Sequence, residues 1–142
     1  IDDVLIFGRS QEELLNRMEE VFSRLSQAGL KLKPKKCRLL ATSTEYLGHV
    51  ISGDGITVNP EKVAAIKNWP VPETHTDVRS FLGTASYYRR FIQDFASIAA
   101  PLHHLTQNGV SFVWSSACQG AFEQLKTALC TAPVLAFPVP GA

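Results

Sequence analysis

The spacing of apolar residues changes at Asn59, and this change is the strongest constraint on the fold. Before it, Thr44–Ser52 alternates in the manner of a strand, and the turn signal Gly53-Asp54-Gly55 joins it to Ile56–Val58 in a hairpin. After it, apolar residues recur every three or four positions, which is typical of helices. A last stretch, Ala132–Pro138, predicts an extended strand with no partner in the chain. The sequence therefore predicts an α+β protein with short antiparallel strands followed by helices.

Capping signals indicate where the helices begin and end. Ser10 and Glu13 have the spacing of a capping box, and the apolar residues after them fall on one side, so this helix is predicted to lie on a sheet. Asn59 caps a second helix, which ends before Pro70. Further helical segments are predicted to begin near Thr76, Pro101 and Ser115 or Ser116.

Two adjacent carboxylates, Asp2 and Asp3, precede the apolar run Val4–Phe7. The run predicts a strand buried on both faces, with the acidic pair on a turn at its end. Carboxylate oxygens on a tight turn are ligands that Mg²⁺ prefers. An acidic pair near a chain end is, however, more often a solvated turn. The residues by themselves leave both interpretations open.

A basic segment follows the first helix. Lys31–Arg38 carries five positive charges in eight residues, among them Lys35 and Lys36. Such charges can neutralise phosphates and release counterions. They are equally typical of a solvated edge that discourages aggregation. This segment is therefore a candidate nucleic-acid contact with an ordinary alternative.

The helix near Thr76 has two contrasting faces. One face carries Arg79, Gly83 and Arg90, with Tyr87 beside it. Arginines can reach phosphates, and a glycine lets a backbone or sugar approach closely. A solvated face explains the arginines equally well, but it explains Gly83 less well, because a mid-helix glycine costs roughly 1 kcal/mol relative to alanine. The opposite face is apolar and is predicted to be buried: Val78, Phe81, Leu82, Ala85 and Tyr88.

Other features exclude several classes of protein. The three cysteines are odd in number and far apart, which argues against a disulfide framework and a zinc site. His49 is typical of an ordinary half-exposed strand residue, and His103 and His104 are typical of surface positions. The net charge of +1 does not by itself indicate a nucleic-acid partner. No apolar run approaches the roughly 18 residues that span a bilayer, so we expect an intracellular protein with no membrane partner.

Several motifs occur in the order found in one family. Ile1–Phe7 resembles the polymerase motif of reverse transcriptases, without the aromatic residue that usually precedes it, and Tyr46-Leu47-Gly48-His49 is similar to their primer grip. The longer stretch Val78–Ile92 resembles the thumb of gypsy-type retrotransposon and retroviral enzymes. The segment around Phe112–Trp114 and Ala132–Leu135 resembles the passage from the thumb into the ribonuclease H-like region. The resemblance covers nearly the whole chain.

The resemblance implies the end of a polymerase palm over residues 1–58, a helical thumb over 59–110, and the start of a connection or ribonuclease H-like region over 111–142. It also implies an RNA-directed DNA polymerase that uses two Mg²⁺ ions, or Mn²⁺, in the complete enzyme. Asp2 and Asp3 would be catalytic metal ligands, with Asp2 the more direct. Tyr46, Leu47, Gly48 and His49 would hold the primer end. The residues expected to contact the duplex are Arg79, Gly83, Tyr87, Arg90, Lys35 and Lys36.

The same resemblance implies the partners and the place of action. The partners would be a template-primer duplex of RNA or DNA and the remainder of a Pol polyprotein, which also carries ribonuclease H activity. The protein would act in a cytoplasmic virus-like particle or in the nucleus. The alternative is a non-catalytic nucleic-acid-binding or interaction module derived from a decayed retroelement.

The family places another catalytic aspartate and the nucleotide-binding fingers upstream of this motif, and neither lies within these 142 residues. We therefore predict that the isolated chain does not polymerise DNA, because its carboxylate pair lacks a partner and holds metal poorly. A primer-extension assay with Mg²⁺ checks this expectation. Robust extension by the chain alone would contradict it.

Overall fold

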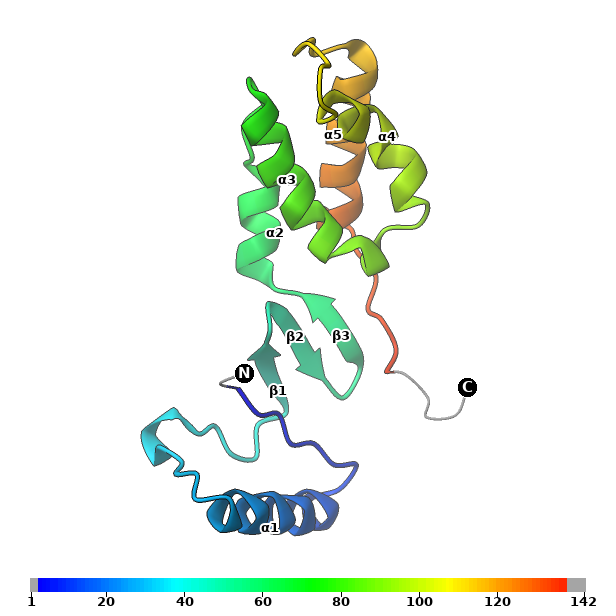
Figure 1. Cartoon of the computed structure of the whole chain (residues 1–142). Helices are drawn as coiled ribbons and strands as arrows, with labels where there is room; N and C mark the ends of the chain where they lie inside the picture. Colours follow the sequence, from blue (N-terminus) through cyan, green and yellow to red (C-terminus); the bar gives the residue numbers. More distant parts are fainter. Residues whose placement is uncertain (1–2, 138–142) are drawn as a thin grey trace.

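The computed structural model describes residues 3–137 and has an α+β architecture, as predicted. Figure 1 shows three tiers: a long helix with irregular segments at one end, a small sheet in the middle, and a helical bundle at the other end. The elements in chain order are α1 (Gln11–Gln27), the 3-10 turn η1 (Pro34–Lys36), β1 (Ser43–Tyr46), β2 (His49–Ser52), β3 (Gly55–Val58), α2 (Pro60–Lys67), α3 (His75–Tyr87), the 3-10 turn η2 (Arg89–Phe91), α4 (Phe95–Leu105) and α5 (Ser116–Cys130).

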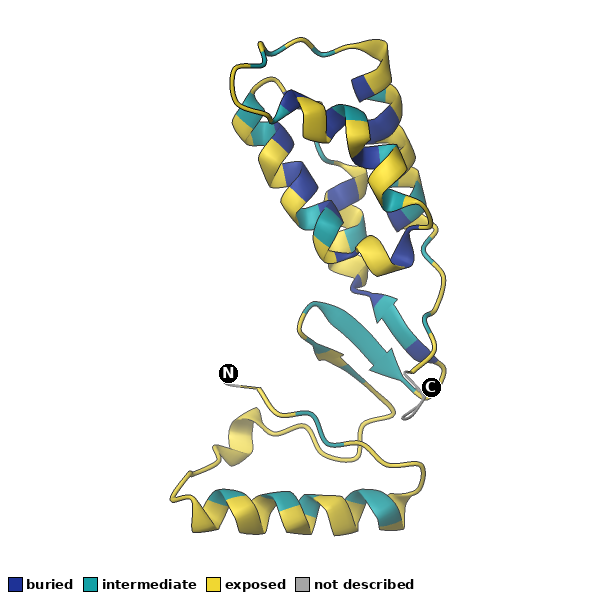
Figure 2. Ribbon diagram, turned by 45° about the vertical axis from the view of Figure 1, so that its right-hand side comes forward, coloured by how far each residue is buried: buried dark blue, intermediate teal, exposed yellow. Residues whose placement is uncertain are grey.

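The hydrophobic core lies in the helical bundle (Figure 2). Its largest fully buried side chains include Phe81 of α3 and Phe122 of α5, whose ring centroids are 4.7 Å apart. The predicted apolar stripe of α3 is buried as expected. α5 lies in the segment assigned by resemblance to the connection, and it packs against α2 and α4. The position of α3 is therefore set by the packing of the whole bundle.

Side-chain caps fix the starts of α2 and α3, and the Asn59 cap of α2 was predicted from the sequence. Asn59 is buried and accepts a hydrogen bond from the Glu61 amide at 2.8 Å, which fixes the start of α2 directly after β3. Thr74 and Asp77 form a complete capping box at the start of α3. The hydrogen bond from the Thr74 hydroxyl is the largest cause that holds the pKa of Asp77 below its usual value. These caps direct the chain from the sheet into the bundle.

α4 is longer than predicted. It begins at Phe95 and continues through Pro101, although the sequence indicated only a short turn near that proline. Proline lacks an amide donor, so this helix loses one backbone hydrogen bond. Burial of Ala99, Leu102 and Leu105 offsets that loss.

The sheet is an antiparallel meander in the order β1, β2, β3. The prediction of one strand over 44–52 is wrong, because the chain reverses at Leu47-Gly48 and Tyr46 pairs with His49. Leu47 and Gly48 have φ values of 51° and 78°, which is the pattern of a two-residue type I′ turn. Leucine disfavours left-handed backbone angles because of its side chain. Of the two turn residues, only Gly48 is therefore a residue that the sequence marks as typical of such a turn.

The C-terminal stretch does find a partner, contrary to the prediction. Leu135 forms an antiparallel bridge with Ile56 of β3, with N–O distances of 2.8 and 2.9 Å. Gly55 makes this approach possible, because a Cβ built there would collide with the Leu135 carbonyl. The chain thus returns from α5 to the edge of the sheet.

The predicted strand at Val4–Phe7 is wrong, since these residues are irregular and no described segment pairs with them as a strand. Val4 and Phe7 are 63% and 64% exposed. The Arg17 guanidinium donates to the Phe7 carbonyl at 2.8 Å and lies over the Phe7 ring.

α1 has no buried residue, so the prediction that it lies on a sheet is wrong within the described chain. No helix of the described residues is long and apolar enough to cross a membrane.

Replacing Gly55 tests the bridge to the C-terminal stretch. We expect Gly55→Ala to lower the free energy of unfolding by about 1–3 kcal/mol, because its φ of 137° suits glycine and a Cβ would meet Leu135. Gly53→Ala is the matched control, since nothing lies within 4 Å of a Cβ there. Urea unfolding measures both variants. Equal effects of the two substitutions would contradict the role of the bridge.

Candidate nucleic-acid interface

The turn between β1 and β2 contacts the end of α3. The Tyr88 hydroxyl donates to the Gly48 carbonyl at 2.8 Å, and the Tyr87 hydroxyl donates to the Leu47 carbonyl. Tyr87 is the last residue of α3 and Tyr88 is its C-cap. The structure therefore brings the four residues predicted to hold a primer, Tyr46–His49, to the helix predicted to contact a duplex.

His49 joins the turn to the aromatic side chains of the bundle. Its ring centroid lies 5.4 Å from those of both Tyr87 and Tyr88, and 5.8 Å from that of Phe91. Its Nδ1 is 3.0 Å from the Leu47 carbonyl, which also accepts from Tyr87. His49 is half-buried in β2, in agreement with the expectation of a half-exposed strand residue. It helps to hold the turn against η2.

Arg79 and Gly83 lie along the exposed side of α3. Nη2 of Arg79 donates to the Thr106 carbonyl at the end of α4, at 3.2 Å. A guanidinium has five N–H donors, and this hydrogen bond uses one of them. A Cβ built on Gly83 would meet nothing within 4 Å. Packing within the chain therefore gives no reason for a glycine here, and the surface beside it is open to close approach.

The predicted register of Arg90 is wrong. α3 ends at Tyr87, and Arg90 lies in the following 3-10 turn rather than on the same helix face. The reason is that the chain tightens after Tyr88, where the Phe91 amide donates to the Tyr88 carbonyl at 3.0 Å. This turn buries Phe91 and leaves Arg90 exposed beyond the helix end.

Lys35 and Lys36 are exposed in η1. η1 belongs to the α1 end of the molecule, whereas the β1–β2 turn faces the helices (Figure 1). The structure thus separates the basic segment from the surface around Arg79 and Gly83. The two do not form one continuous patch in this chain.

Of the two adjacent aspartates, only Asp3 is among the residues that the structure describes. Asp2 lies outside the described residues, and Asp3 is exposed on the irregular segment. Between residues 3 and 137, no group of three or more His, Cys, Asp or Glu side chains is placed to hold a metal ion. The donor chemistry of Asp3 suits Mg²⁺, but the described residues do not form a complete site.

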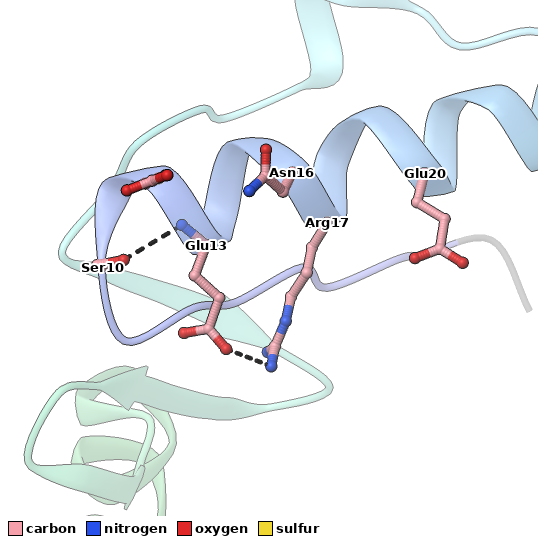
Figure 3. A pocket seen from close by; sticks show the side chains of 6 residues that line it. Ser10, Glu13, Asn16, Arg17 and Glu20 are labelled. Atoms are coloured by element: carbon pink, nitrogen blue, oxygen red, sulfur yellow. Dashed lines mark hydrogen bonds and ion pairs between the residues drawn. The ribbon is translucent and has the colours of Figure 1, made fainter.

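A shallow surface hollow runs along α1 and contains Ser10, Glu13 and Arg17 (Figure 3). The Ser10 hydroxyl caps the helix by accepting from the Glu13 amide at 3.2 Å. The Glu13 carboxylate pairs with Arg17 at 2.5 Å. These polar groups satisfy one another within the helix end, so the hollow is explained by capping and not by a ligand.

Comparison with known proteins gives the family. The family model described as reverse transcriptase (RNA-dependent DNA polymerase) matches residues 1–51. The chain is 38% identical over 139 residues to a retrovirus-related Pol polyprotein from transposon 297 of Drosophila melanogaster, with 97% of this chain aligned. It is 36% identical over 138 residues to the Gag-Pol polyprotein of gibbon ape leukemia virus, again with 97% aligned. This chain belongs to the reverse transcriptase family.

Solved structures agree with the assignment of this reverse transcriptase segment. The foamy viral protease-reverse transcriptase in complex with double-stranded DNA matches it with a TM-score of 0.78 and 30% identity, covering 92% of this chain and 23% of that one. The same viral enzyme in complex with an RNA/DNA hybrid gives a TM-score of 0.77. The segment spans 13% of the transposon 297 polyprotein and 8% of the gibbon ape leukemia virus polyprotein.

Sequence reasoning missed the role of Tyr88 in this reverse transcriptase segment. It placed Tyr88 on the buried stripe, and the side chain is indeed only 2% exposed. A buried tyrosine hydroxyl needs a hydrogen-bond partner, and this was the available signal. Burial, and next the neighbouring Tyr87, raise the pKa of Tyr88 above its ordinary value. The protonated Tyr88 hydroxyl therefore adds to the free energy of unfolding below about pH 10. This contribution is lost as the pH rises through the higher pKa of Tyr88 in the folded state.

The two residues of the turn, Leu47 and Gly48, are expected to respond differently to substitution. We expect Gly48→Ala to lower the free energy of unfolding by about 1–2 kcal/mol, because Gly48 has a positive φ and a Cβ would lie 3.1 Å from the Tyr88 hydroxyl. Leu47→Gly is the control. It relieves a left-handed leucine at some entropic cost, so we expect a change of less than about 1 kcal/mol. Chemical denaturation measures both, and a larger loss for Leu47→Gly would contradict the assigned turn.

Proposed function

We propose that this chain is the part of an RNA-directed DNA polymerase that grips the primer end and follows the template-primer duplex. The observation that carries the proposal is the contact between the Leu47-Gly48 turn and the end of α3. It places a motif similar to a primer grip beside the open side of a helix that carries Arg79 and Gly83. No observation in the described chain favours the alternative of a non-catalytic module.

The chemistry of the surface supports a duplex as the ligand. Gly83 leaves room for a sugar-phosphate backbone, and Arg79 presents further N–H donors beside it. The half-exposed ring of Tyr87 lies between this helix and the turn. The similar foamy viral enzyme has been solved in complex with double-stranded DNA and with an RNA/DNA hybrid, and we extend duplex binding of both kinds to this chain.

The polymerase reaction itself belongs in this proposal to the complete Pol polyprotein. Bound Mg²⁺ would supply charge stabilisation for nucleotidyl transfer. Asp2 and Asp3 would contribute carboxylate oxygens to the metal site, together with residues of the longer protein. The Leu47-Gly48 turn would position the primer end, and α3 would hold the duplex in line with it.

Arginine substitutions test duplex binding. We expect the chain to bind a short DNA duplex at low salt, measured by fluorescence anisotropy, and to weaken steeply as salt rises. Arg79→Ala and Arg90→Ala should each weaken binding and reduce the slope of log K against log salt by about 1, if each arginine neutralises one phosphate.

Arg24→Ala is the matched control, because Arg24 lies on α1 and pairs with Glu20 at 2.5 Å. It removes the same charge far along the chain from α3, so its effect should be smaller. Absence of binding at low salt, or an equal loss from all three arginine variants, would contradict the proposed function.

A further inference from the structure

We propose that Tyr87 and Tyr88 are positioning residues that lock the Leu47-Gly48 turn to the end of α3, so that turn and helix meet a duplex as one surface. This inference rests on the proposed function and deepens it. It assigns the primer-gripping geometry to two hydroxyl groups outside the hairpin.

The two tyrosines are arranged so that each reaches one carbonyl of the turn. They are consecutive in sequence, their ring centroids are 5.0 Å apart, and their planes are nearly perpendicular at 89°. The hydroxyls donate to the carbonyls of consecutive residues, Leu47 and Gly48. A two-point attachment of this kind restricts the orientation of the turn as well as its distance from the helix.

The lock acts on a turn that is strained by its own sequence. Leu47 is held at a φ of 51°, which a residue with a side chain adopts at a cost. Such a conformation persists when surrounding contacts determine it. The Leu47 carbonyl accepts from the Tyr87 hydroxyl and lies 3.0 Å from Nδ1 of His49. The His49 contact lies within the hairpin, whereas the Tyr87 contact comes from outside it and adds to the contacts that favour the observed conformation.

The two tyrosines differ in burial, and this difference gives them different parts in the lock. Tyr88 is 2% exposed and anchors the contact in the bundle core, whereas Tyr87 is 55% exposed and lies at the surface. The turn approaches so closely that a Cβ on Gly48 would lie 3.4 Å from the Tyr87 ring. If α3 shifted, Leu47 and Gly48 would therefore move with it.

Replacing each tyrosine by phenylalanine removes the hydroxyl and keeps the ring. We expect the double variant Tyr87→Phe with Tyr88→Phe to raise amide hydrogen exchange over residues 46–50, while exchange over α5 is unchanged. Affinity for a DNA duplex should fall about tenfold, as expected for the loss of two neutral hydrogen bonds. The salt slope should not change, because no positive charge is lost.

Thr131→Val is the matched control. It also removes a hydroxyl that donates to a carbonyl at 2.8 Å, that of Thr127 at the end of α5. It should leave both the affinity and the exchange of residues 46–50 unchanged. Because the exposed Tyr87 contributes little to the core, Tyr87→Phe alone serves as the test if the double variant fails to fold.

The outcomes separate the two proposals. Failure of the wild-type chain to bind a duplex overturns the proposed function. Binding by the wild type, with no change of exchange at residues 46–50 in the phenylalanine variants, overturns the lock. Faster exchange at the turn with unchanged affinity also overturns it, because the hydroxyls would then serve only the fold.

Discussion

Tyr88 belongs to two parts of the molecule at once, and the arrangement of the sheet on the bundle depends on it. Its ring is buried among the helices, and its hydroxyl holds the Gly48 carbonyl at 2.8 Å. A buried hydroxyl without a partner would be costly, so the core can accept this ring only if the turn is in place. The packing of the bundle and the position of the hairpin are therefore linked by one side chain.

Buried apolar side chains are distributed unevenly between the two ends of the molecule. In the described chain, the buried apolar side chains all lie between Val58 and Leu129, whereas α1 has none (Figure 2). Stability follows buried apolar contacts, so the bundle and the strand joined to it form the more stable part, and α1 is the part most prone to local opening. The sheet lies between the two. It is held to the bundle by the tyrosine pair, by the chain through Asn59, and by the bridge from Leu135 to Ile56.

Much of the fold could be predicted because its signals are local. The apolar stripe of α3, the Asn59 cap and the helix of α5 each depend on residues within a few positions of one another. The same holds for the motif around Tyr46–His49, whose residues are adjacent. The strand predicted at Val4–Phe7 failed for a different reason. A strand depends on a neighbouring strand, and the apolar run alone cannot supply one.

The sequence by itself determined the helices α2, α3 and α5, the buried face of α3, the family motifs and the open side of α3 at Gly83. Only the tertiary structure decided that the chain turns at Leu47, that α3 ends at Tyr87, and that Leu135 returns to β3. The physical reason is the range of the interactions. A cap or an apolar stripe is encoded within a few residues, whereas the left-handed Leu47 is held by the Tyr87 hydroxyl, which lies forty positions away in the sequence and donates to the Leu47 carbonyl.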